Sequence, residues 1–506
     1  MARKRLYQHS RFDGGMTHNN RDTSDLTKSS FIAHLDIYRE NHRAYGMPGF
    51  VNFNAYGGTA TGLKTHDVRN FASQGSYVFA LGTRADGTGS KVFQFQVGVD
   101  SEWSNATTFG YHAEGAGNLV THPFLIIANA AAYFPVVDGV ETDVARVTSN
   151  IYNGAWFNTW IGGVPTGDTS YTYYIKGFDN KLYLVKGGFS GISELTSSTV
   201  NINAKPTALA PISITSGDYA IGIAGNNTNP VDSRVLLWDA ASLLADQNIR
   251  LGSESARVIG FPNNVYTTVS FPAFNTLETN GTAQMNVRLI QGESAQIIYK
   301  INAPTITGMR EHDINEYYSN AMLWYARIPT NAAGNQFVQG VWAAGAGSAA
   351  SQFGVSMLLD TSSLGIVERA VQIGQSTFFA HNLDGSVSRL GDFQTGTYDV
   401  PAYIETLFYG ADTPFQKQLE GISVITENLP AGGTVEVQYR FDENSAFVSM
   451  GVSDTDDRQV HNFTKVAGVP IGKFKEIQFK IILVGKIALK SYLVSTTEEE
   501  DLSFKI

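Results

Sequence analysis

The chain has 506 residues, of which 43% are hydrophobic and only 16% are charged, and it contains 50 glycines and no cysteine. This composition favours a large β-rich core and argues against disorder, while the lack of cysteine excludes disulfides and thiolate-bound metal. The net charge of −10 disfavours a general nucleic-acid binder. No run reaches the roughly 18 apolar residues of a membrane-spanning helix, and no secretory signal peptide is recognisable at the start.

Residues 1–50 are predicted to form an extended N-terminal arm. The segment is rich in His, Arg, Asn and Ser, and only Phe31-Ile32 and Leu35–Tyr38 are apolar enough to pack. We expect the arm to dock partly on its own chain or on a neighbouring protein. A loosely ordered terminus is the alternative.

Residues 51–405 repeat a turn signature at intervals of 41 to 54 residues. Asn, Asp and Gly accept the backbone conformations of tight hairpin turns, and a repeat of this length made of short strands is typical of a propeller blade. The sequence therefore predicts an all-β fold, a β-propeller of six to eight blades with seven expected. The turn pairs are Asp86-Gly87, Asp138-Gly139, Asp179-Asn180, Asn226-Asn227, Asn280-Gly281, Gly334-Asn335 and Asp384-Gly385.

Short apolar segments flank four of these turns and are predicted to pair as hairpins. Short helices are expected only at Ala240–Asp246 and Asn315–Tyr325. The paired segments are Tyr77–Leu81 with Lys91–Val97, Tyr171–Lys176 with Leu182–Val185, Tyr219–Ala224 with Arg234–Trp238, and Thr377–His381 with Val387–Leu390.

Residues 406–496 follow a different pattern. Thr434–Phe441 and Lys475–Ile481 alternate between apolar and polar residues, as strands with one solvated face do. We predict a separate C-terminal antiparallel β-sandwich over 406–496. Residues 497–506, which include Glu498–Asp501, are predicted to be a solvated acidic tail.

No catalytic, cofactor-binding or metal-ligating residue is assigned from the sequence. Gly345–Ala350 matches a dinucleotide fingerprint but lacks the strand–helix context that the motif needs, and the ten His show no metal-ligand spacing. Trp156, Phe157 and Trp160 are the best candidates for a surface aromatic contact, with a place in the core as the alternative. The chain is therefore not expected to be an enzyme.

Both ends of the chain resemble virion proteins of tailed bacteriophages. Tyr7–Met16 reads Tyr-Gln-His-Ser-Arg-Phe-Asp-Gly-Gly-Met and follows a basic start, like the arm and F-D-G-G-M element that precede the propeller in such proteins. Phe474–Lys480 and Leu489–Leu493 resemble the closing strands of tail hub (nozzle) and tail-tip proteins.

The resemblance implies a structural part of the phage tail, located in the virion and assembled with other tail proteins, as a homo-oligomeric ring in the case of a hub. Genome DNA would be transient cargo only, which an acidic surface suits. The arm would dock on a neighbouring protein through Arg3, Lys4, Arg5, Tyr7, Arg11 and Phe12. The alternatives are a carbohydrate-active propeller, either glycosidase or lectin-like, and a head-decoration protein.

Overall fold

The computed structural model describes residues 3–39, 43–52, 66–74, 76–84, 90–100, 104–105, 118–120, 125–128, 133–137, 140–141, 155–161, 172–178, 181–188, 191–201, 205–213, 219–228, 231–238, 244–245, 247–252, 254–272, 283–347, 352–373, 376–381, 386–390, 396–411, 413, 415–466 and 468–498. In these ranges the regular elements are β-strands and one short 3-10 helix, η3 (Pro262–Asn264). The predicted all-β class is confirmed.

Most strands between residues 50 and 390 fall into successive four-strand units. Within the described ranges, six units are separate four-stranded sheets, and strands β26–β29 form one end of a larger sheet. The units are β6 (His66–Gln74), β7 (Tyr77–Arg84), β8 (Ser90–Gln96) and β9 (Ser104–Asn105); β10 (Asn118–Val120), β11 (Leu125–Ala128), β12 (Tyr133–Val137) and β13 (Val140–Glu141); β14 (Ala155–Ile161), β15 (Thr172–Phe178), β16 (Lys181–Gly188) and β17 (Gly191–Asn201); β18 (Lys205–Ser213), β19 (Tyr219–Thr228), β20 (Val231–Trp238) and β21 (Gln247–Gly252); β22 (Glu254–Gly260), β23 (Thr267–Pro272), β24 (Ala283–Gln291) and β25 (Ser294–Ala303); β26 (Arg310–Tyr318), β27 (Ala321–Pro329), β28 (Phe337–Gly345) and β29 (Gly354–Asp360); and β30 (Val367–Ile373), β31 (Ser376–His381), β32 (Ser386–Leu390) and β5 (Phe50–Asn52).

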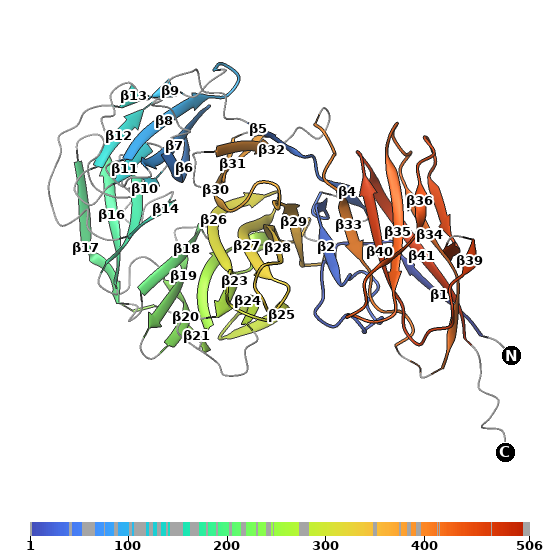
Figure 1. The fold of residues 1–506 in the computed structure, drawn as a ribbon. Coiled ribbons are helices and arrows are strands. Elements are labelled where there is room, and N and C mark those ends of the chain that lie inside the picture. Colours follow the sequence, from blue (N-terminus) through green and yellow to red (C-terminus); the bar gives the residue numbers. More distant parts are fainter. Residues whose placement is uncertain are drawn as a thin grey trace.

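The first strands of successive units lie next to one another. β6 contacts β10, β10 contacts β14, and the relation continues through β18, β22 and β26 to β30. β30 in turn contacts β6, so the series of contacts returns to the first unit. Figure 1 shows the units following one another around a curve, with the C-terminal strands to one side.

The last unit takes its fourth strand from the N-terminal segment. β5 pairs antiparallel with β32, with Val51 opposite Arg389. Two distant parts of the sequence therefore complete one sheet, and the start of the chain holds the end of the series in place.

The remaining strands build two sheets that share a hydrophobic core. β2 joins β26–β29 to C-terminal strands in one nine-stranded sheet, ordered β26-β27-β28-β29-β2-β33-β40-β35-β36. The other sheet has the order β3-β4-β41-β34-β37, and β1 pairs with β41. Val437 and Ile481 from the first sheet and Val424 and Val494 from the second belong to one buried cluster. The strands are β1 (Arg3–His9), β2 (Phe31–Ala33), β3 (Leu35–Asp36), β4 (Ala44–Gly46), β33 (Ala402–Glu405), β34 (Lys417–Thr426), β35 (Thr434–Arg440), β36 (Val448–Ser453), β37 (Val460–Phe463), β40 (Gln478–Val484) and β41 (Ala488–Glu498), beside a small hairpin of β38 (Lys465–Val466) and β39 (Val469–Pro470).

All four hairpins predicted from the sequence are present. β7 pairs with β8, β15 with β16, β19 with β20, and β31 with β32. The turn predicted at Asn226-Asn227 is displaced, because both residues lie in β19 opposite Ser233 and Asp232.

The helix predicted at Asn315–Tyr325 is wrong. Residues 310–318 and 321–329 are strands β26 and β27, which pair with Tyr318 opposite Ala321. Ala321–Pro329 is almost wholly buried, as is usual for a strand covered on both faces. Its sequence therefore lacks the alternation of apolar and polar residues that marks a strand with one solvated face. The other predicted helix, Ala240–Asp246, lies mainly outside the described residues.

The strand pairing moves two of the predicted domain boundaries, those after residues 405 and 496. Ala402–Glu405, assigned to the propeller, forms β33 and pairs with β40 in the C-terminal part of the nine-stranded sheet. Thr497 and Glu498, assigned to the acidic tail, belong to β41. Glu498 is buried, and Arg5 and Thr413 bind its carboxylate, which offsets the cost of burying the charge.

Candidate functional site

The two chain ends that carry the phage resemblance meet in one sheet. β1 runs antiparallel to β41, with Tyr7 opposite Val494 and His9 opposite Tyr492. β40, from the other C-terminal segment of the resemblance, lies in the facing sheet, where Phe479 contacts the ring of Tyr409 with centroids 6.2 Å apart. We call this region the terminal junction.

Aromatic side chains form the core of the terminal junction. The His9 imidazole stacks on Tyr492 with ring centroids 4.4 Å apart, and its Nε2 lies 2.9 Å from the Tyr409 hydroxyl. Tyr7 packs on Tyr409 at 4.8 Å and Phe12 on Tyr492 at 6.2 Å. Burial lowers the pKa of His9 to about 3, although the charge of Asp25 opposes the shift. His9 is therefore neutral near pH 7 and fits an apolar environment.

The Asp13–Met16 segment attaches the start of the chain to β29. Gly15 has a φ of 64°, and a Cβ atom there would lie 2.5 Å from the Val355 backbone nitrogen. The Met16 N–H donates to the Val355 carbonyl at 2.8 Å. Arg11 holds the Asp13 carboxylate at 2.6 Å. Glycine is needed at position 15 both for its backbone conformation and for this close approach.

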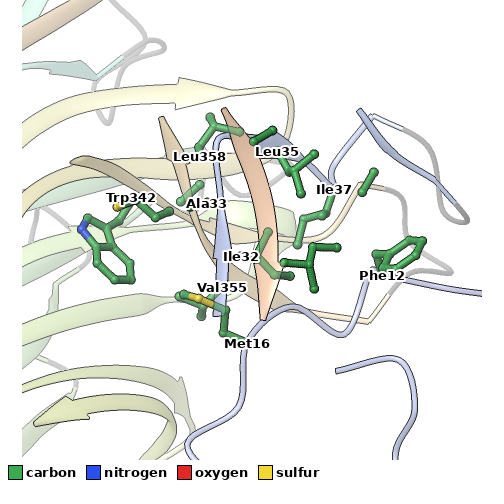
Figure 2. Packing of buried hydrophobic residues seen from close by; sticks show 14 of the residues in the cluster. Phe12, Met16, Ile32, Ala33, Leu35, Ile37, Trp342, Val355 and Leu358 are labelled. Atoms are coloured by element: carbon green, nitrogen blue, oxygen red, sulfur yellow. The ribbon is translucent and has the colours of Figure 1, made fainter. Parts of the chain in front are cut away.

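Strand β2 then links the series of four-strand units to the C-terminal strands. Ala33 pairs parallel with Met357 of β29, and Ile32 pairs antiparallel with Ile404 of β33. Figure 2 shows Phe12, Met16, Ile32, Ala33, Leu35 and Ile37 packed together with Val355, Leu358 and Trp342. The nine-stranded sheet and the buried cluster to which these residues belong thus run through both parts of the molecule.

The predicted docking residues are largely engaged within the chain itself. Tyr7 and Phe12 are buried, so in this fold they contact the chain's own core rather than a surface open to a partner. Lys4 pairs with Glu420 at 2.7 Å, Arg5 with Glu498 at 3.0 Å, and Arg11 with Asp13. The backbone of Arg3 lies opposite Glu498, and its side chain is outside the described residues. The side chains of Lys4, Arg11 and Arg5 remain 59%, 39% and 21% exposed.

The predicted aromatic contact residues lie on β14, the first strand of its unit. Trp156 is opposite Lys176 and Trp160 is opposite Tyr174, with a register shift between them. The side chains of Trp156, Phe157 and Trp160 are outside the described part of the chain.

Two glutamates on β26 link neighbouring first strands. The Glu311 carboxylate lies 3.6 Å from Arg257 of β22, and Glu316 accepts the Gln372 N–H of β30 at 2.9 Å. Burial raises the pKa of both carboxyls, against the opposing effects of Arg257 and of backbone N–H donors respectively. Raised carboxyl pKa values suit a proton donor, but each side chain also serves to tie adjacent units together.

Among the residues that the structure describes, no group of three His, Cys, Asp or Glu is placed to hold a metal ion. No helix in the same residues is long and apolar enough to cross a membrane.

The chain matches no family model and no curated protein sequence. Solved structures with a similar outline include the hydrazine synthase of Kuenenia stuttgartiensis (15% identity, 54% of this chain and 76% of that chain, TM-score 0.35) and BBS1N in its complex with ARL6DN (8%, 68% and 96%, 0.40). An exo-beta-1,3-galactanase from Phanerochaete chrysosporium is a third, with 11% identity over 89% of this chain and 99% of that chain and a TM-score of 0.29. Likenesses at this level carry no argument about function, which must come from the residues themselves.

Proposed function

We propose that this protein is a structural component of a bacteriophage tail, either a hub (nozzle) or a tip protein, built as a seven-bladed β-propeller with a C-terminal β-sandwich. The supporting observation is the terminal junction. The two segments that resemble phage tail proteins, far apart in sequence, lie against each other through His9 and Tyr492.

The pattern of contacts suits a mechanical role. A strand from the N-terminal segment completes the last four-strand unit, and β2 makes the sixth unit continuous with the C-terminal strands. Interfaces between domains that are small and polar permit relative motion. A shared sheet and core oppose such motion, so force applied to one end would reach the other.

In this proposal the protein lies in the virion tail and contacts other tail proteins, and a hub would be a homo-oligomeric ring. Genome DNA would pass it without lasting contact, which the net charge of −10 favours because basic surfaces retain the phosphate backbone. A ring whose inner surface proved basic would contradict the DNA-conduit part of the proposal.

Electron microscopy of purified particles from the source that encodes the chain tests the location. Antibody or tag label should decorate the distal tail, and reconstruction should separate a ring of copies from a few copies at the tip. Label on the capsid lattice would favour head decoration instead. Absence of the protein from all particles would overturn the proposal.

A carbohydrate-active propeller is the second candidate, because the pKa of two glutamates on a first strand, Glu311 and Glu316, is raised. Hydrolysis of a polysaccharide that Glu311→Gln or Glu316→Gln abolishes, with folding retained, would favour it. Unchanged turnover in both variants, or no turnover, would leave these residues as structural links.

A further inference from the structure

A hollow lies where the fifth and sixth four-strand units meet. It is formed by the β22–β23 and β26–β27 connections, is open to solvent and has a volume of about 420 Å³. Among the described residues that line it, none carries a charge. They are Phe261, Pro262, Asn263, Asn264, Tyr317, Ser319 and Asn320.

The backbone around the hollow is held in an uncommon conformation. Asn263, Asn264 and Ser319 have φ angles of 52°, 62° and 54°. In the described part of the chain, five non-glycine residues have positive φ, and these are three of them. For Ser319 this conformation costs about 1 kcal/mol or more, whereas Asn accepts it more readily. Residues held in it occur in turns and at ligand sites.

Two contacts between the units fix the walls of the hollow. The Asn263 carboxamide donates to the Ala346 carbonyl at 2.9 Å and accepts the Ala346 N–H at 2.6 Å. The Phe261 N–H donates to the Tyr317 hydroxyl at 2.9 Å. The hollow is therefore formed before any ligand arrives, which lowers the entropy that binding must overcome.

The side chains facing solvent here are of two kinds. Asn264, Ser319 and Asn320 are exposed and supply amide and hydroxyl groups that both donate and accept hydrogen bonds. Tyr317 is 36% exposed, and Phe261 is half-buried against Tyr266 with ring centroids 4.7 Å apart. Aromatic surface beside neutral hydrogen-bonding groups matches a ligand with an apolar ring face and a rim of hydroxyls.

We propose that this hollow binds a neutral saccharide. The Tyr317 ring packs on one face of a sugar, while Asn264, Ser319 and Asn320 bind its hydroxyls. An anionic sugar would bring a charge to a site whose described lining residues include no cation to pair with it. The proposal does not depend on the assembly role, because the site is defined by this chain alone.

Glycine substitutions give a clean test, since glycine adopts positive φ at no steric cost. Asn264→Gly and Ser319→Gly remove one polar side chain each and keep the backbone. Asp457→Gly is the matched control, because Asp457 also has positive φ (59°) but lies between β36 and β37, outside the lining. The probes are the β-linked trisaccharides of glucose, galactose and N-acetylglucosamine, titrated into the full chain by calorimetry and NMR.

At least one probe should bind the wild-type protein with a Kd of about 1 mM or tighter. Each hollow variant should weaken that binding by about tenfold, the loss of a hydrogen-bonding group in a formed site, and Asp457→Gly should not change it. No binding of any probe at about 10 mM, or equal binding by all four proteins, overturns the proposal. Binding of uncharged peptides without any saccharide would do the same and would reassign the hollow.

Discussion

The imidazole of His9 stacks on the ring of Tyr492 with centroids 4.4 Å apart and an interplanar angle of 13°. One ring comes from the first strand of the chain and the other from the last described strand, so the contact joins the two ends. Its strength should depend on the protonation of His9.

Acid should destabilise the protein through His9. The folded-state pKa is lowered to about 3 from 6.5, so between these values the unfolded chain binds more protons. The contribution of neutral His9 to the free energy of unfolding is complete above pH 6.5. It falls as the pH drops, by about 1.4 kcal/mol per pH unit over the lower part of this window. Urea unfolding at pH 7, 6 and 5 measures the loss.

His9→Gln is the control for this prediction, because glutamine still reaches Tyr409 but does not titrate. Its unfolding free energy should fall less between pH 7 and pH 5 than that of the wild type. His34, whose pKa burial lowers to about 4, titrates in both proteins and cancels in the comparison. Parallel pH profiles would contradict a buried neutral His9.

Gly15→Ala should strongly destabilise the N-terminal attachment. The new Cβ would lie 2.5 Å from the Val355 nitrogen, on a backbone with φ of 64°, so the loss should be about 3 kcal/mol or more. Gly432→Ala has a similar φ of 74°, but its Cβ would have no atom of the described residues within 4 Å, and the substitution should cost only about 1 kcal/mol. Equal losses, read from thermal or urea unfolding, would show that the close contact with β29 does not matter.

Lys417→Met should destabilise the C-terminal sheets by at least about 3 kcal/mol. The buried Lys417 ammonium lies 2.8 to 3.2 Å from the Gly410, Thr413, Phe415 and Lys475 carbonyl oxygens, which share its three N–H donors. Methionine fills the space and leaves these acceptors without their cation. Lys465→Met, at an exposed position, should change stability by less than about 0.5 kcal/mol. A loss below about 1 kcal/mol in Lys417→Met would mean that water replaces the ammonium.

A double-mutant cycle on Glu254 and Arg288 should give a coupling of about 1 to 3 kcal/mol. The guanidinium meets the carboxylate at 2.5 and 3.0 Å, and Arg288 is largely buried. The exposed pair Arg21–Glu443, 3.2 Å apart, is the comparison and should couple by less than about 0.5 kcal/mol. Unfolding free energies of Glu254→Gln, Arg288→Met and the double variant provide the test, and equal coupling in both pairs would refute it.

The sequence predicted the β-class and the order of hairpins because these depend on local turn chemistry. Six of the seven turn pairs lie at or next to the connection between the second and third strands of successive units, as Gly334-Asn335 does between β27 and β28. The exception, Asp138-Gly139, lies between the third and fourth strands. The fifty-residue interval therefore follows one recurring connection.

Long-range pairing was not predictable from local patterns. Phe31–Ala33 is three residues long, and its two neighbours in the sheet, β29 and β33, follow more than 300 residues later. Arg3–His9 reads as a polar arm, yet it pairs along its length with β41. In both cases the buried partner, rather than the propensity of the segment, determines the strand.

The hollow between the fifth and sixth units was missed for a similar reason. Nothing in the local sequence separates Tyr317 from the nearby aromatics Trp324 and Tyr325, yet the fold buries those two and leaves Tyr317 exposed. Pro262-Asn263-Asn264 has the composition of a turn, but nothing local places it beside Ser319 of the next unit.

The pairing of β5 with β32 and of β1 with β41 also bears on how the protein is made. The ribosome synthesises β1 and β5, which lie in the first 52 residues, long before it reaches their partner strands β41 and β32. Non-local strand pairing is also slow. β5 must therefore wait, unpaired, until β32 has been synthesised, and β1 must wait until β41 has been synthesised. A chain that ends early lacks the partner for β1 and exposes unpaired strand edges of the kind that promote aggregation, so premature termination at any point before β41 should yield insoluble fragments rather than a smaller working protein.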